Sequence, residues 1–402
     1  MLLSRRDAVI VFLAFAFGYF FSALVRAVTA TLAPALTQEF SLDAADLGLL
    51  AGGYFLGFAG TQLPLGAWLD RHGPRKVILG FLAVAVAGCV AFSMATDFST
   101  LFAARLLCGA GLGACLMAPL TGYRRWLAPE DQLRANSWML MTGSFGMLSS
   151  TLPVQWLVPI AGWRPLFLGL AALLVLAMLL IAWKVPAWTA APAAATPASY
   201  REVWRHPFFR RMTPVGFFSY GGMVAMQTLW AGPWMVRVAG YDPLASATGL
   251  FVINLAMLVA FWAWGMVTPS LVRRGILPER LIAWGLPASF VVMAGLLLAG
   301  PAAGAGAWAL FCVSSTFMSL AQPAVGMAFP QALAGRALSA YNLVIFAGVF
   351  IVQWGVGLLV DALLALGWSQ LASFRGALGV FLALSIASWL YLLLGPRDNP
   401  VQ

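Results

Sequence analysis

The chain has 402 residues, of which 62% are hydrophobic and only 9% are charged, and its mean hydropathy is +0.90. Since a water-soluble chain carries about 25% charged residues, this composition excludes a soluble globular protein. The net charge of +10 comes from short basic runs between long apolar stretches, so it indicates membrane topology rather than a nucleic-acid site.

Apolar stretches long enough to cross a bilayer, roughly 20 residues each, follow one another along the whole chain. They predict an all-α polytopic membrane protein with twelve transmembrane helices. In chain order, we expect the spans near residues 8–36, 47–69, 77–96, 101–123, 136–160, 165–183, 213–236, 245–269, 281–300, 306–329, 338–366 and 376–394. The first is too long for the apolar region of a cleavable signal peptide, about 7–15 residues, so we interpret it as an uncleaved span.

The longest polar interruption divides the chain into two halves. Residues 1–184 are expected to form an N-terminal six-helix bundle, residues 185–211 a cytoplasmic linker, and residues 212–402 a C-terminal six-helix bundle. With both termini inside, most arginines and lysines fall on the cytoplasmic side. The outer side keeps only Arg105, Arg164, Arg237 and Arg375, so the positive-inside rule predicts cytoplasmic termini.

A weak internal duplication supports two related halves. Arg71-His72-Gly73 recurs as Arg273-Arg274-Gly275, and Gly162-Trp163 recurs as Gly367-Trp368, at nearly the same offset. Parallel repeats of this kind place a substrate site between the halves, near the bilayer midplane.

The loop after the second span reads Gly66-Ala-Trp-Leu-Asp70-Arg71-His-Gly73-Pro-Arg75-Lys76 and resembles the signature loop of the major facilitator superfamily. The resemblance implies a latch that is made in one access state and broken in the other. Gly66 would allow close helix contact, Asp70 would meet a helix N-terminus, and Arg71 and Arg75 would hold the cytoplasmic face. In the second half Val272 stands where Asp70 would, which predicts a one-sided latch.

The fourth span resembles another pattern of that superfamily. It reads Leu101-x-x-x-Arg105-x-x-x-Gly109-x-Gly111-x-Gly113. The resemblance implies a coupling or gating role for Arg105, and the alternative is an interfacial anchor. The glycine-rich proline pattern typical of drug/proton antiporters is not recognisable around Gly143 and Gly146.

Arg26 is the strongest functional indication. It lies ten residues before the end of the first span at Leu36, roughly 15 Å along a helix, and so near the middle of the bilayer. Charges there usually mark a substrate or ion path. Tyr19, Ser22, Arg26 and Thr29 share one helix face, which predicts a polar stripe lining the central cavity.

A guanidinium in a cavity favours a planar anion, either carboxylate or phosphate. Arg26 followed by Pro34 is similar to the first-helix pattern of organic-anion and organophosphate transporters within the superfamily. The organophosphate branch brings a second arginine from the seventh helix, where this chain has Gln227 and Thr228. A carboxylate-type monoanion is therefore favoured over a phosphate ester.

Further polar and aromatic residues lie near the middle of other spans, where they are candidates either for substrate contact or for helix-to-helix hydrogen bonds. They are Tyr54, Gln62, Gln155, Gln227, Trp230, Asn254, Gln322, Asn342 and Gln353. Asp361 is expected at the periplasmic edge of the eleventh span, as a gating or coupling group that could follow the outside pH.

These features predict a secondary transporter that moves a small organic anion by alternating access. The alternative is a proton-coupled exporter of amphipathic compounds, and the driving force could be proton symport, anion exchange or facilitated movement. We expect no enzyme activity, no cofactor and no metal site, since no catalytic constellation lies in the spans. The expected partners are a small-molecule substrate, the bilayer and a proton or counter-anion, for a monomer in the bacterial inner membrane that binds no nucleic acid.

Overall fold

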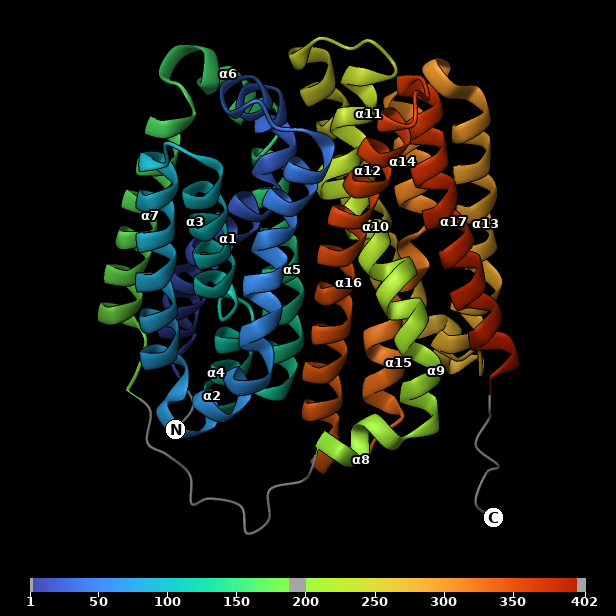
Figure 1. Ribbon diagram of the computed structural model, residues 1–402. Helices are drawn as coiled ribbons and strands as arrows, with labels where there is room; N and C mark the ends of the chain where they lie inside the picture. Colours follow the sequence, from blue (N-terminus) through green and yellow to red (C-terminus); the bar gives the residue numbers. More distant parts are fainter. Residues whose placement is uncertain (1–2, 188–199, 396–402) are drawn as a thin grey trace. The chain divides into compact units, whose positions relative to one another are not determined.

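The computed structural model describes residues 3–187 and 200–395, and every regular element in these ranges is a helix (Figure 1). Nine of the helices in the described ranges are long and apolar enough to cross a membrane. The long helices are α1 (Arg5–Phe40), α2 (Ala44–Met94), α7 (Trp163–Lys184), α12 (Pro243–Arg273), α13 (Pro278–Ala299), α16 (Gln331–Ala365) and α17 (Gln370–Leu394).

The other expected spans are broken into shorter helices. The fourth consists of α3 (Phe98–Leu112) and α4 (Met117–Trp126), the fifth of α5 (Pro129–Ser149) and α6 (Leu152–Ala161), and the tenth of α14 (Ala305–Ser314), η4 (Thr316–Leu320) and α15 (Ala321–Met327). The seventh runs through α9 (Pro207–Val215), α10 (Gly221–Ala225) and α11 (Ala231–Arg237), with π-helical turns η1 (Gly216–Tyr220) and η2 (Met226–Trp230) between them. Short elements are α8 (Tyr200–Arg205) and η3 (Gly300–Ala302).

The described residues fall into two compact units. Of the described residues, the first contains 3–32 and 53–187, and the second contains 33–52 and 200–395. The end of α1 and the first turns of α2 thus pack with the second unit. The domain boundaries expected from the sequence stay a prediction, and residues 188–199 of the expected linker lie outside the described residues.

Glycines bring the helices of the first unit into backbone contact. A Cβ added at Gly109 of α3 would overlap the carbonyl oxygen of Tyr54 on α2, and one added at Gly57 of α2 would overlap the carbonyl oxygen of Leu106 on α3. On the other side of α3, Gly111 lies against the backbone of Ala85. Helix α2 turns at Gly73 and so has two arms, one before and one after this residue. The small residues of the fourth span allow α3 to pack between these two arms.

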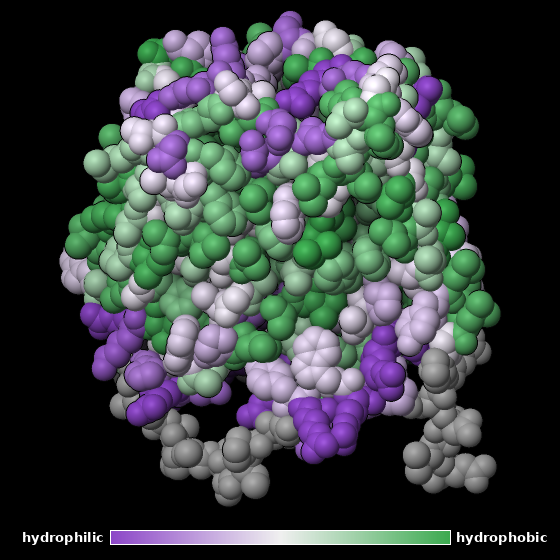
Figure 2. All heavy atoms as spheres, in the orientation of Figure 1, coloured by the Kyte–Doolittle hydropathy of each residue, from purple (hydrophilic) through white to green (hydrophobic). Residues whose placement is uncertain are grey.

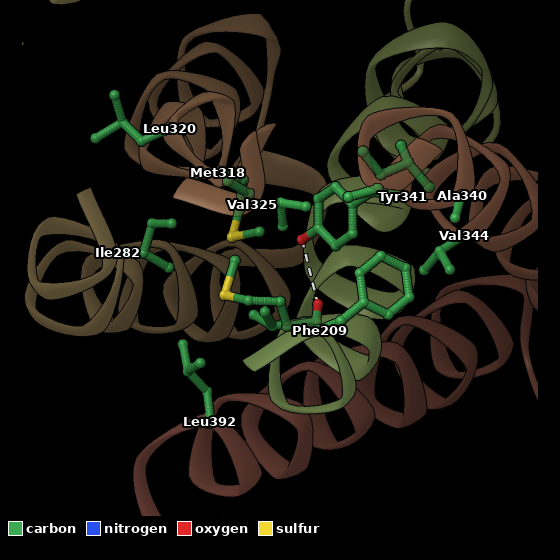
Figure 3. Packing of buried hydrophobic residues seen from close by; sticks show 14 of the residues in the cluster. Phe209, Ile282, Met318, Leu320, Val325, Ala340, Tyr341, Val344 and Leu392 are labelled. Atoms are coloured by element: carbon green, nitrogen blue, oxygen red, sulfur yellow. Dashed lines mark hydrogen bonds between the residues drawn. The ribbon is translucent and has the colours of Figure 1, made fainter. Parts of the chain in front are cut away.

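In the second unit, α16 packs against α10 and α17, as Figure 1 also shows. Phe209, Ile282, Met318, Tyr341 and Leu392 belong to one buried cluster that joins α9, α13, η4, α16 and α17 (Figure 3). The Tyr341 hydroxyl donates a hydrogen bond to the Met212 carbonyl at 3.2 Å, so the one polar group of this ring is satisfied inside the cluster.

Figure 2 shows hydrophobic side chains along the middle of the helices and hydrophilic ones near their ends, as a bilayer requires.

The duplication found in the sequence reappears in the backbone. Gly73 and Gly275 have φ angles of 76° and 79°, and Gly162 and Gly367 have φ angles of 82° and 85°. Side chains disfavour this left-handed region, so glycine is required at each of the four turns. Both repeated sequence pairs thus mark the same kind of turn in both halves.

Two arginines expected on the outer side, one in each half, donate hydrogen bonds to carbonyls at the end of a neighbouring helix. Arg164, near the start of α7, donates to the Ala95 carbonyl at 2.9 Å, just beyond the end of α2. Arg375, near the start of α17, donates to the carbonyls of Leu297 and Leu298 in α13 at 2.6 and 2.9 Å. Cations are favourable at helix C-termini, where carbonyls lack intrahelical partners.

Replacing this second arginine is expected to destabilise the protein. Arg375→Gln cannot reach both carbonyls, so the free energy of unfolding should fall by about 1–3 kcal/mol. Thermal melting followed by tryptophan fluorescence would measure the change, with the exposed Arg205→Gln as the matched control. An Arg375→Gln variant that melts like the control would show that the two hydrogen bonds do not stabilise the fold.

Candidate functional site

The predicted polar stripe lies on one face of α1. Tyr19, Ser22 and Thr29 are all buried, and Arg26 is partly buried beside them. Helix α1 extends to Phe40, beyond the expected end of the span. Arg26 therefore lies 14 residues before the helix end, roughly 21 Å along the axis.

Aromatic side chains surround the Arg26 guanidinium. The central guanidinium carbon, Cζ, lies 5.6 Å from the centre of the Phe58 ring, which is a cation–π distance. The phenol groups of Tyr19 and Tyr54 are its electrostatic neighbours. The Tyr19 ring in turn leaves no room for a side chain at Gly143, where an added Cβ would lie 2.6 Å from it. Helices α1, α2 and α5 together form this aromatic environment.

Several polar atoms of this cluster are buried without an internal partner. In the described ranges, Arg26 Nε, Ser22 Oγ and Tyr54 Oη make no hydrogen bond. Ion pairs among the described residues include Arg211–Glu279 and Arg134–Asp131, and Arg26 has no acidic partner there. Because buried polar groups are normally hydrogen-bonded, a cationic cluster with free donors is suited to receive an anion.

Arg105 lies next to this cluster and is fully buried. It donates to the carbonyls of Val25 and Arg26 at 2.8 and 3.1 Å, and its guanidinium lies 5.0 Å from the centre of the Tyr54 ring. Because the side chain is buried inside the protein, it is not exposed as an interfacial anchor would be. Its role in coupling or gating stays a prediction.

The acid nearest to Arg105 in the sequence is engaged elsewhere. Asp97 is the N-cap of α3, where its carboxylate accepts a hydrogen bond from the Thr100 N–H at 2.9 Å. This bond holds the pKa of Asp97 below its usual value. The partners of Arg105 are thus backbone carbonyls.

The other residues predicted in the first half have separate positions. Thr29 is buried on α1, and Gln62 donates to the Phe58 carbonyl of its own helix at 3.2 Å. Gln155 is partly buried on α6. The structure thus brings Tyr19, Ser22, Arg26 and Tyr54 together.

The second unit holds an amide network. Gln227 donates to the Asn254 oxygen at 3.0 Å, and Asn254 donates to the Leu250 carbonyl at 2.9 Å. Gln353 donates to Thr228 Oγ1 at 3.0 Å and accepts the Trp230 indole N–H on its backbone carbonyl at 3.1 Å. In these described residues Gln353 Oε1 has no partner.

A second amide pair joins α15 and α16, where Gln322 donates to the Asn342 oxygen. Gln227, Thr228 and Trp230 all belong to the π-helical turn η2. Such turns occur mostly as single turns inside α-helices and are frequent at functional sites. All five polar candidates of the second half therefore make hydrogen bonds between helices or within them.

The basic loop after the second span is a sharp turn within α2, made at Gly73. Asp70 and Arg71 are exposed there, and Arg75 donates to the Ala182 carbonyl of α7. An added Cβ at Gly66 would meet no atom within 4 Å in the described part of the chain, and the close helix contact expected there stays a prediction. The latch role of Asp70, Arg71 and Arg75 stays a prediction.

Asp361 lies near the end of α16 and binds the start of α2. Its carboxylate accepts the Ala44 and Ala45 N–H groups at 3.2 and 2.6 Å. A carboxylate at a helix N-terminus is stabilised by the free N–H groups and the helix dipole. Its gating or coupling role stays a prediction.

Comparison with known proteins shows which family the chain belongs to. Residues 15–353 match the Major Facilitator Superfamily, which covers most of the chain. The chain belongs to this superfamily. The prediction of an all-α polytopic membrane protein with twelve transmembrane helices is confirmed by this match and by the solved structures of the superfamily.

Two solved structures of the superfamily share the fold over nearly the full length. A D-xylose-proton symporter has a TM-score of 0.80 at 13% identity, covering 97% of this chain and 98% of the other. A bacterial homologue of the human lysosomal transporter Spinster, facing inward and unoccupied, has a TM-score of 0.77 at 16% identity, covering 98% and 97%.

Curated superfamily members are similar over shorter segments. A probable sulfoacetate transporter of Cupriavidus necator is 24% identical over 56% of this chain and 56% of its own length. A 4-hydroxybenzoate transporter of Pseudomonas aeruginosa is 32% identical over 37% of this chain and 33% of its own length. The chain thus spans between about a third and just over half of these relatives.

Two residues of the Arg26 cluster are missing from the sequence-based candidates. Phe58 lies on the same face of α2 as Tyr54, four residues further on, so that spacing could have found it. Cys115, which the structure places near Ser22, follows the glycine-rich run where α3 ends, and nothing in the sequence marks that break.

Proposed function

We propose that this chain is a secondary transporter that moves a small organic anion across the membrane by alternating access, with a carboxylate-type monoanion as its substrate. The observation that carries the proposal is Arg26, a guanidinium deep in a membrane helix with a free Nε and no acidic partner among the described residues. Such a charge is costly in the bilayer, and where one occurs it usually marks a substrate or ion path.

The surroundings of Arg26 fit this class of ligand. A planar carboxylate can accept two hydrogen bonds from one guanidinium, and the Tyr54 and Ser22 hydroxyls are free to donate to the same group. The rings of Phe58, Tyr19 and Tyr54 supply apolar surface for the organic part. The relatives named after sulfoacetate and 4-hydroxybenzoate are named after organic carboxylates, which supports a carboxylate group on the substrate.

Further features of the proposal follow the family. The chain would act without chemistry on its substrate, as a monomer in the bacterial inner membrane, with both termini in the cytoplasm. The amides of Gln227, Asn254 and Gln353 would add polar contacts to the substrate path, and Asp361 would take part in gating. A proton or a counter-anion would drive the movement.

A ligand screen on the purified protein tests the proposal. A ligand present at about 100 times its dissociation constant should raise the free energy of unfolding by roughly 2.7 kcal/mol, which thermal melting detects. We expect stabilisation by simple and aromatic monocarboxylates, and less by phosphate esters. Stabilisation by lipophilic cations or neutral amphipathic compounds alone would contradict the anion proposal and favour an exporter.

A further inference from the structure

A groove of about 570 Å³ opens on the first unit, away from the Arg26 cluster. It is bounded by both arms of α2 and by α3, and it falls within the range of about 300–1,000 Å³ that ligand pockets occupy. Its lining residues come from the turns of α2 on either side of the Gly73 break, together with two small residues of α3. They are Thr61, Trp68, His72, Lys76, Val77, Gly80, Phe81, Val84, Ala110 and Gly111.

The groove is hollow because side chains are missing from its floor. Gly111 lies against the backbone of Ala85, so α3 closes the bottom without filling the space. Gly80 borders open space, since an added Cβ there would meet no atom within 4 Å in the described residues. The rings of Trp68 and Phe81 meet edge to face, with their centres 5.8 Å apart, and form an aromatic wall.

Polar groups are confined to one end of the groove. The exposed Lys76 and His72 lie at the turn of α2, next to the basic residues of the loop. Deeper in, the Thr61 hydroxyl already donates to the Phe58 carbonyl at 2.8 Å, so this donor is engaged within the helix. A cation at the mouth and an apolar channel behind it fit an amphipathic ligand with an anionic head.

We propose that this groove binds a glycerophospholipid with a negatively charged headgroup. One acyl chain lies along Gly80 between Trp68 and Ala110, and the headgroup phosphate lies at Lys76. The basic end of a membrane helix is where anionic lipids gather, and each lysine near the bilayer surface strengthens their binding about fivefold. This site is separate from the Arg26 cluster and does not depend on the proposed transport function.

Native mass spectrometry of the detergent-purified full chain tests the proposal. The protein is exposed to equal amounts of phosphatidylglycerol and phosphatidylcholine with matched acyl chains. We expect preferential retention of phosphatidylglycerol, and Lys76→Gln should reduce the preference about fivefold. Gly80→Leu should abolish retention of one lipid, because the new side chain occupies the groove. Gly169→Leu, at an exposed glycine of α7 that also borders open space, is the matched control.

The outcomes separate the parts of the proposal. Lipid retention that Gly80→Leu leaves equal to the Gly169→Leu control would overturn the groove as the binding site. Retention that Gly80→Leu abolishes but Lys76→Gln does not alter would overturn the anionic headgroup. Equal displacement by a free fatty acid would overturn the assignment to a phospholipid. Melting curves check that both variants are folded, which is expected because the substituted positions are exposed.

Discussion

Arg26→Gln is expected to weaken binding of a carboxylate ligand by roughly 10- to 150-fold, since a hydrogen bond to a charged group contributes about 1.5–3 kcal/mol. Isothermal titration of the purified variant with the best anion from the screen would measure this. Arg26→Lys keeps the charge but loses the two-pronged geometry, so it should bind more tightly than Arg26→Gln and less tightly than the unmodified chain.

The stability of the same variant separates a binding role from a structural one. Arg26 Nε is buried and has no partner among the described residues, so removing the charge should leave the ligand-free melting temperature unchanged or raise it. Arg375→Gln is the matched control, which should melt earlier but keep its response to the anion. If Arg26→Gln melts earlier while binding the anion normally, Arg26 is a structural residue and the proposed site is wrong.

Gly109→Ala is expected to destabilise the first unit by about 1–3 kcal/mol or more, because its Cβ would overlap the backbone carbonyl of Tyr54. A backbone atom cannot turn away as a side chain can, so α3 has to move from α2. The movement displaces Tyr54 and Arg105 as well, and anion binding should weaken along with stability. Thermal melting and titration measure the two effects.

A double substitution sharpens this test. Gly57→Ala opens the same helix contact from the other side, so the two changes together should cost less than their sum. Gly60→Ala on α2 is the control, since its Cβ would meet no atom within 4 Å in the described residues and alanine favours a helix. A Gly109→Ala variant as stable as Gly60→Ala would show that α3 does not need this close approach.

The spans could be predicted from the sequence because the bilayer requires long apolar stretches, and the polar stripe of α1 because helical spacing determines which residues share a face. The partners of Arg105 could not be predicted, since backbone carbonyls carry no sequence signature. The sequence predicts the seventh span as one continuous stretch, and the structure divides it by the π-helical turns η1 and η2. In the Arg26 cluster, the α1 face follows from helical spacing and Phe58 follows from its spacing to Tyr54, whereas Cys115 joins the cluster through tertiary packing.

The packing of residues 33–52 with the second unit limits how the protein can be divided. A chain cut between Lys184 and Tyr200 would yield an N-terminal fragment that carries these residues but lacks α16. The N–H groups of Ala44 and Ala45 would then lose the Asp361 carboxylate. Each fragment produced alone would expose a surface that the other normally covers, so the two should accumulate only when they are made together in the same cell.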